Sequence, residues 1–336
     1  MNRKIFNNLC TYAQKTNLDK LVISAAEKNI IIDGYQKNGT SRRFLLPKKL
    51  EQEFFINLQK ILAISPGELM TEKRGKIKRS LDHLNYRLSV LPDNKREKII
   101  INIIKPSLEL WRLEQLGLSR VDLKNLKLSC QKKSGLIIIS SPPAQGKSST
   151  LRALLLYLNS NDLSIYSLED HPPYKLPGVS TMSARSENLE RILRQDSDCL
   201  FIDNLDQPAL LKGALRAAAT GRLVIGSLTA ASSWEVLQKV WQINLPARLK
   251  LDSLKLIINQ RLAKLSRQPK INNSNHRQLI GLFELFKLSP TLKNIILTKP
   301  ELNDQKFLDK LKKSALKEGY RSWEDDKTQK IKEGLL

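Results

Sequence analysis

The stretch Gly135-Leu-Ile-Ile-Ile-Ser-Ser-Pro-Pro-Ala-Gln-Gly-Lys-Ser-Ser-Thr-Leu-Arg-Ala-Leu154 decides the fold of this chain. The run from Leu136 to Ile139 is short and wholly apolar, which predicts a strand buried on both faces of a parallel sheet. Turn-forming residues follow over 140–145, and leucines then recur on one side of a predicted helix from Ser148 to Leu158. The stretch therefore predicts a strand, a loop and a helix in succession.

The loop ends in Gly146-Lys-Ser148, as in the phosphate-binding pattern G-x-x-x-x-G-K-[ST], although Ser141 stands where the pattern has its first glycine. Backbone amides of such a loop surround a phosphate, the lysine reaches the outer phosphates, and the hydroxyl can ligate Mg²⁺. A chance Gly-Lys-Ser in a turn is the alternative. The flanking strand and helix favour a site for ATP and Mg²⁺, formed by Gly146, Lys147, Ser148 and Ser149, with Ser148 as a metal ligand.

Length and composition indicate a soluble chain of two domains. The 336 residues suffice for two cores, and no apolar run approaches the ~18 residues that a membrane span needs. The N-terminus lacks the apolar segment of a signal peptide. Cysteines occur only at 10, 130 and 199, a spacing that suits a reducing compartment and predicts neither disulfides nor a zinc site. We therefore expect a cytoplasmic protein.

The formal net charge of +24 concerns binding partners rather than fold. Nucleic acid, an anionic membrane surface and acidic proteins are all compatible with it. The basic residues are scattered and few aromatic residues lie among them, whereas a nucleic-acid groove would interleave stacking rings. We therefore expect a solvated lysine-rich surface and no specific binding of nucleic acid.

The order of predicted elements divides the chain into five parts. A polar lead segment (1–18) precedes a small α+β domain (19–105), with strands expected at 21–24, 29–33, 43–46, 86–92 and 98–104, a turn at Asn38-Gly39 and a helix over 47–64. A helical connector (106–130) follows, broken at Gly117 and capped by Ser119. The P-loop core (131–266) and a helical C-terminal region (267–336) complete the chain.

Strands and helices alternate in the core. Strands are expected at 164–168, 199–202 and 223–226, with helices over 186–194 and 207–219, and this alternation predicts an α/β fold with a doubly wound parallel sheet. Beyond Ser233 we expect mainly helices, over 249–265, 304–317 and from the cap Ser322 toward Gly334. Ligands of such sheets bind at the carboxyl ends of the strands. Asp203 ends the 199–202 strand and is a candidate ligand of Mg²⁺ through water, or else an ordinary turn residue.

Beyond the P-loop, the chain resembles the type II secretion and type IV pilus assembly ATPases. Collinear segments from about residue 19 onward carry the resemblance: Arg87-Leu-Ser-Val-Leu-Pro92, Leu113-Glu-Gln-Leu-Gly-Leu-Ser119, Ser167-Leu-Glu-Asp170 with Tyr174-Lys-Leu-Pro-Gly178, Ile192-Leu-Arg-Gln-Asp-Ser-Asp198, Ala214-Leu-Arg-Ala-Ala-Ala-Thr-Gly221, Gln260-Arg-Leu262, Gly281-Leu-Phe-Glu-Leu285 and Glu318-Gly-Tyr-Arg321. The last two match C-terminal helices of the family. The resemblance implies a RecA-like P-loop NTPase core.

Several positions depart from the family. Asn204 replaces the Walker B glutamate, Pro173 replaces the second glutamate of the aspartate box, and Arg222 and Thr229 stand at the histidine positions of the histidine box. The four-cysteine zinc motif is missing, and the amino-terminal docking domain of longer members is not expected in this chain. An amide at 204 cannot accept a proton from water. These departures predict a degenerate active site without zinc.

The resemblance also implies roles for other residues. Glu169 and Asp170, the retained acidic pair of the aspartate box, are candidate catalytic groups alongside the degenerate position Asn204, or else residues of a solvated turn. Arg87, and less directly Arg222, would face phosphates at a neighbouring subunit's site, or else form surface salt bridges. The family implies a ring, homomeric or heteromeric and hexameric, that works with an inner-membrane platform protein on the cytoplasmic face of that membrane.

Three hypotheses remain open. In the first, the chain is a nucleotide-binding subunit of an assembly motor with weak or absent hydrolysis. In the second, it is an active motor ATPase whose catalytic carboxylate has moved to another position. In the third, it is a structural ring partner of an intact paralogue and does not depend on nucleotide.

Overall fold

The computed structural model describes residues 12–13, 16, 18–36, 41–50, 53, 72–78, 83–93, 96–104, 111–159, 163–170, 176–266, 279–298, 302 and 304–336. It divides into two compact units, Met1–Leu108 and Glu109–Leu336. No helix among these residues is long and apolar enough to cross a membrane.

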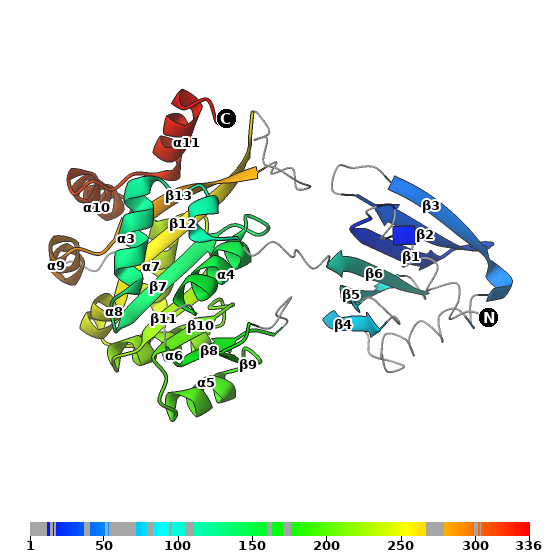
Figure 1. Ribbon diagram of the computed structural model, residues 1–336, viewed down its shortest axis with the longest axis horizontal. Helices are drawn as coiled ribbons and strands as arrows, with labels where there is room; N and C mark the ends of the chain where they lie inside the picture. The colour runs from blue at the N-terminus through cyan, green and yellow to red at the C-terminus, as the bar shows by residue number, and fades with distance from the viewer. Residues whose placement is uncertain are drawn as a thin grey trace. The chain divides into compact units, whose positions relative to one another are not determined.

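The first unit contains a six-stranded antiparallel sheet in the order β3-β2-β1-β6-β5-β4 (Figure 1). Its strands are β1 (Lys20–Ala25), β2 (Asn29–Tyr35), β3 (Ser41–Pro47), β4 (Glu72–Lys78), β5 (His83–Asp93) and β6 (Arg96–Ile104). Alternate residues are buried in β2, including Ile30 and Ile32, and in the described part of β6, including Ile99 and Ile101. This period-2 pattern arises because one face of the sheet covers the core.

The five strands expected in this unit are confirmed, and β4 was missed. Its sequence, Glu-Lys-Arg-Gly-Lys-Ile-Lys, has one large apolar residue and gives no strand signal. Of the helix expected over 47–64, the described residues include a 3₁₀ turn, η1 (Lys48–Leu50), and Glu53, which is helical. The rest of that helix, apart from Glu53, and the turn at Asn38-Gly39 lie outside the described residues.

The second unit contains a seven-stranded sheet in the order β13-β12-β7-β11-β10-β8-β9 (Figure 1). Its strands are β7 (Gly135–Ser141), β8 (Ile165–Leu168), β9 (Val179–Met182), β10 (Cys199–Ile202), β11 (Leu223–Thr229), β12 (Leu254–Lys264) and β13 (Leu279–Lys287). Strands β7 to β12 pair in parallel, and β13 pairs antiparallel to β12 at one edge. The doubly wound α/β fold expected for the core is confirmed.

Helices cover both faces of this sheet. They are η2 (Leu113–Gln115), α3 (Arg120–Cys130), α4 (Lys147–Leu158), α5 (Ser186–Leu193), α6 (Pro208–Ala219), α7 (Ser233–Gln242), α8 (Ala247–Ser253), α9 (Pro290–Thr298), α10 (Gln305–Lys317) and α11 (Trp323–Lys332). One apolar cluster joins η2, α3 and α4 to Ile137 and Ile139 of β7, and a second joins α5 to α10 to Leu136 and Ile138. Consecutive residues of β7 thus pack into opposite cores, which explains why the run from Leu136 to Ile139 is wholly apolar.

Two helix caps were predicted correctly. The Ser119 hydroxyl accepts from the backbone N–H of Asp122 at the start of α3, and Ser322 does the same for Asp325 at the start of α11. These bonds satisfy amides that have no acceptor within the helix. Gly117, where the connector was expected to break, has φ of 99°.

The helix expected over 249–265 is wrong. Helix α8 ends at Ser253, and Leu254 begins β12, which lies between β7 and β13. Because both faces of this strand are buried, its apolar residues do not alternate, and a short apolar run without alternation does not separate a strand from a helix. The segment Gly281–Leu285, expected to be helical by resemblance, is likewise part of strand β13, and strand β9 was missed.

Candidate functional site

The loop between β7 and α4 has the geometry of an anion-binding turn. Ala144 and Gly146 both have positive φ, 60° and 84°, and Gly146 is the N-cap of α4. The first amides of the helix have no acceptor within it, so they are available to an anion at the helix N-terminus. Ser148 and Ser149 are exposed in that first turn. Loop, amides and hydroxyls therefore lie together, as the sequence predicts.

Ser141, the departure from the loop pattern, does not distort the turn. It is the last residue of β7, is fully buried, and has no positive φ, so a side chain there costs no left-handed strain. Its hydroxyl donates to the carbonyl oxygen of Pro142 at 2.7 Å. A glycine at 141 is thus not required for this loop conformation.

Lys147 points to the carboxyl edge of the sheet. Its Nζ donates to the carbonyl oxygen of Ser141 at 3.1 Å and lies 3.5 Å from the hydroxyl of Thr229, the last residue of β11. Burial lowers the pKa of this lysine, and the nearby carboxylates of Asp206 and Asp203 oppose the shift. Both weak contacts are to neutral oxygens, which a phosphate with full negative charge can replace.

Strand β12 supports the loop from the side. Gln260 accepts from the Thr150 hydroxyl of α4 at 2.7 Å and donates to the Gln145 carbonyl oxygen at 2.6 Å, and the Gln145 side chain accepts from the Leu262 backbone N–H at 2.7 Å. A Cβ at Gly146 would lie 3.0 Å from the Gln260 amide nitrogen. Glycine at 146 is therefore required by its positive φ and by this close approach.

Acidic residues follow β10 at the same edge of the sheet. Asp203 is half-buried, and Asn204 and Asp206 are exposed. The Asn204 side chain accepts from the backbone N–H of Asp206 at 2.9 Å, which shapes the turn. The Asp206 carboxylate accepts from Thr229 twice, from its backbone N–H at 2.9 Å and from its hydroxyl at 2.7 Å. Asp206 is thus fixed near Lys147, and sequence reasoning missed it.

These residues fit a magnesium nucleotide. Among the described residues, no three His, Cys, Asp or Glu side chains are grouped closely enough to hold a metal ion by themselves. Mg²⁺ does not need such a cage beside a nucleotide, because it keeps waters and takes ligands from phosphate oxygens. The exposed Ser148 hydroxyl and the carboxylates near Lys147 supply the remaining oxygen chemistry.

Comparison with known proteins gives the family. The family model described as "Type II/IV secretion system protein" matches residues 1–320. The chain belongs to this family. It is 25% identical over 293 residues to type II secretion system protein E of Dickeya dadantii, covering 83% of this chain and 59% of that protein. It is 28% identical over 229 residues to the type IV pilus assembly ATPase PilB of Pseudomonas aeruginosa, covering 65% and 40%.

The fold is shared with a protein of known structure. The crystal structure of the pilus retraction motor PilT with bound ADP matches with a TM-score of 0.66 and 18% identity, covering 95% of this chain and 94% of that chain. The chain spans about three fifths of the length of type II secretion system protein E. The predicted RecA-like fold and membership of the secretion and pilus assembly ATPases are confirmed.

The two acidic residues of the family's aspartate box are both engaged in structural contacts. Glu169 is 5% exposed, accepts from Arg152 of α4 in an ion pair, and accepts from the Ser167 hydroxyl at 2.5 Å. Asp170 accepts from the backbone N–H of Ala184 at 3.0 Å. Pro173 lies outside the described residues. Glu169 therefore joins the P-loop helix to β8, a contact that only the structure reveals.

The two arginines expected to face phosphates lie in different units, and Arg222 is not at the P-loop edge of the sheet. Arg222 precedes β11, at the amino end of the parallel strands, and its guanidinium donates to Ser197, Thr220, Leu193 and Gln195. Those four partners hold it within its own unit. Arg87 lies in β5 of the first unit, opposite Arg74 in β4 and Asn102 in β6. Its expected role toward a neighbouring subunit stays a prediction.

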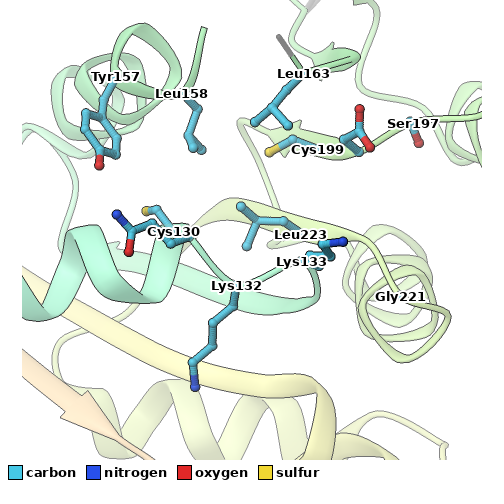
Figure 2. Close-up of a pocket in the computed structure, with 12 residues that line it drawn as sticks. Cys130, Lys132, Lys133, Tyr157, Leu158, Leu163, Ser197, Cys199, Gly221 and Leu223 are labelled. Atoms are coloured by element: carbon cyan, nitrogen blue, oxygen red, sulfur yellow. The ribbon is translucent and has the colours of Figure 1, made fainter. Parts of the chain in front are cut away.

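A cavity of about 470 Å³ lies at the amino end of the strands, opposite the P-loop edge (Figure 2). Cys130, Cys199, Tyr157 and Leu223 contribute to its wall. Burial raises the pKa of the Cys130 thiol to about 12, and burial is also the main cause of the raised pKa of Cys199. Because the thiolate is the reactive form, these thiols are poor nucleophiles and poor metal ligands at neutral pH.

Proposed function

We propose that the chain binds Mg-ATP or Mg-ADP at the Lys147 loop and acts as a P-loop subunit of a type IV pilus or type II secretion assembly motor, with weak or absent hydrolysis. The observation that carries the proposal is the loop itself, where a left-handed Gly146, the first amides of α4, Lys147 and two exposed serines converge. The pilus retraction motor PilT, crystallised with bound ADP, supports the choice of nucleotide.

Weak hydrolysis follows from the residue at the Walker B position. Phosphoryl transfer depends on positioning, on charge stabilisation and on a group that orients the attacking water. Asn204 can hydrogen-bond to water but cannot accept its proton, and its side-chain oxygen already accepts from Asp206. Lys147 and the loop amides hold the phosphates, while bound Mg²⁺ would neutralise charge on them. The chain therefore keeps its groups for binding and lacks the usual group for turnover.

The assembly and its location are part of the proposal. We propose a homo- or hetero-oligomeric ring, a hexamer, at the cytoplasmic face of the inner membrane beside a platform protein. Relatives named for type II secretion and type IV pilus assembly support a role in such a system. A ring partner that needs no nucleotide is the competing hypothesis. Mass measurements with and without Mg-ATP, alone and mixed with a candidate paralogue, test the ring. A chain that stays monomeric in every mixture contradicts it.

The binding test uses equilibrium titration with a fluorescent ATP analogue. Lys147→Ala removes a charge-assisted contact to phosphate and is expected to weaken binding by about 10- to 100-fold. Lys310→Ala, an exposed lysine on α10, is the matched control and is expected to leave binding unchanged. An unchanged dissociation constant in Lys147→Ala, or no binding by the parent, contradicts the proposal. A steady-state ATPase assay then separates weak from full turnover.

An active ATPase with a carboxylate elsewhere is the second candidate function. Asp206 beside Thr229 is the observation that favours it, because it places an acidic group near Lys147. Glu169 is a poor candidate for this role, since it is buried in its ion pair with Arg152. Turnover at the rate of an intact relative would favour this second function over the first.

A further inference from the structure

Asp206 is held in place by the end of a neighbouring strand. One of its carboxylate oxygens accepts from the Thr229 backbone N–H at 2.9 Å and the other accepts from the Thr229 hydroxyl at 2.7 Å. The backbone N–H of Asp206 donates to Asn204 at 2.9 Å, which fixes the turn from its other side. The exposed carboxylate is thus held by two bonds to Thr229, and the backbone that carries it is held by a third.

The anchor also links this carboxylate to the P-loop. The Thr229 hydroxyl lies 3.5 Å from the Lys147 Nζ, so a single hydroxyl separates the ammonium from the carboxylate. The Thr229 carbonyl oxygen accepts from Lys239 of α7 at 2.5 Å, which adds a second cation to the same edge. Thr229 stands where the resemblance places a histidine, so the anchor is itself a departure from the family's pattern.

Glu169 and Asp170, the acidic pair of the aspartate box, are less suited to face a nucleotide. Glu169 is buried against Arg152, and Asp170 is bound to the backbone of Ala184. The carboxylate of Asp206 has about four acceptor positions, and Thr229 occupies two of them, so two remain for a metal-bound water. Among the charges around Lys147, Asp206 contributes the larger opposition to its lowered pKa, ahead of Asp203.

We propose that Asp206, rather than Glu169 or Asp170, is the acidic group that faces the metal and the outer phosphates of a nucleotide bound at Lys147. The proposal rests on nucleotide binding at that lysine, the function proposed above. In this proposal Asp206 supplies the carboxylate that Asn204 lacks, from a different position on the loop that follows β10.

The charge of Asp206 predicts opposite effects on free and magnesium-bound nucleotide. A carboxylate near the outer phosphates repels ATP without metal and attracts Mg-ATP. Removing the charge in Asp206→Asn, which keeps the shape, is therefore expected to tighten binding of the free nucleotide and weaken binding of its magnesium complex. The ratio of the dissociation constant for free nucleotide to that for the magnesium complex is therefore expected to fall on the order of tenfold. A residue with only a structural role would change both constants in the same direction.

The experiment titrates the full chain with AMP-PNP, once with EDTA and once with Mg²⁺, so that turnover does not enter. Asp206→Asn is compared with the parent, with Asp206→Glu, which keeps the charge and is expected to keep most of the ratio, and with Glu190→Gln, an exposed carboxylate on α5 that is expected to change nothing. Thr229→Val keeps the carboxylate and the backbone N–H that bonds to it but removes the bond from the hydroxyl, and an intermediate ratio is expected. Thr229→Ser retains the hydroxyl and is expected to restore the parental ratio.

The two proposals fail in different ways. If the parent binds AMP-PNP neither with EDTA nor with Mg²⁺, the proposed function is wrong and this inference falls with it. If the parent binds and Asp206→Asn has the parental ratio, only the inference is overturned. The same holds if Glu169→Gln lowers the ratio as much as Asp206→Asn does, because the acidic group would then be Glu169.

Discussion

In the proposed function, Asn204 is the residue that separates nucleotide binding from turnover. It stands at the Walker B glutamate position of the family, and its side chain accepts from the backbone of Asp206 at 2.9 Å. The amide thus has a structural contact of its own and shapes the turn that carries Asp206. It has no proton-accepting group to offer an attacking water.

Asn204→Glu is expected to raise the turnover number without tightening nucleotide binding, because a restored carboxylate acts in the transition state. Groups that accept a proton or orient water contribute about 10²–10⁴-fold, which is the upper bound of the gain. Steady-state ATPase and equilibrium titration measure the two effects separately. Asn204→Gln is the control, because glutamine has the length of glutamate but no charge, and it should show no gain in turnover. Equal rates in both variants would refute the local explanation.

Backbone patterns predict more of this fold than of its site. Strands β7, β10 and β11 each contain a continuous apolar run and were found from the sequence, because a central parallel strand has no exposed face. The same property misled the prediction at β12, where burial on both sides left no period to distinguish strand from helix. Strand β9 has only four residues and few apolar side chains.

At the site, the loop and Lys147 could be predicted, because a local motif encodes them. Asp206, Gln260 and Arg152 could not, because each acquires its role from a contact with an element far along the chain. The position of Asp206 soon after the end of β10 was the available signal, since ligands of parallel sheets bind at that edge. The resemblance at Gln260-Arg-Leu262 identified this segment, but it did not indicate that Gln260 contacts the P-loop.

Strand β12 supports the P-loop through Gln260, and that support is testable. Gln260→Ala leaves the buried Thr150 hydroxyl and the Gln145 carbonyl without this partner, so the free energy of unfolding is expected to fall by about 1–3 kcal/mol. Nucleotide binding should weaken as well, by several-fold, because the loop amides are no longer held in one arrangement. Urea unfolding and equilibrium titration measure the two effects.

A matched control separates stability from loop geometry. Gln238 of α7 donates to the Leu302 carbonyl oxygen at 2.7 Å in the same unit, a contact that involves neither β7 nor α4. Gln238→Ala is therefore expected to lower stability while nucleotide affinity stays at the parental value. If both variants weaken binding equally, the loss in Gln260→Ala reflects general destabilisation and β12 has no special part in the site.

Across the second unit, the buried thiols report on the stability of the whole sheet. Cys199 is fully buried at the start of β10, and its pKa, like that of Cys130 at about 12, is raised mainly by burial. An unfolded thiol ionises near ~8.5, so the folded state holds its proton to higher pH. The raised pKa in the folded state contributes to the free energy of unfolding. This contribution is fully present below the pKa of the unfolded thiol and is lost as pH rises toward the pKa of the folded state. At pH 7.5 the buried thiols therefore make their full contribution to stability.

Cys199 can therefore measure nucleotide binding from the opposite edge of the sheet (Figure 2). In a Cys10→Ser, Cys130→Ala background at pH 7.5, a bulky thiol reagent is expected to reach Cys199 only when the unit opens. A ligand that binds the folded state alone suppresses opening by the factor 1 + [L]/Kd, so Mg-ATP at about 100 times its Kd should slow labelling about 100-fold. Adding Lys147→Ala should leave the rate without nucleotide nearly unchanged and remove most of the protection. Labelling that Mg-ATP does not slow, in a chain shown to bind it, would mean that Cys199 is reached by local opening at the cavity, independent of the P-loop.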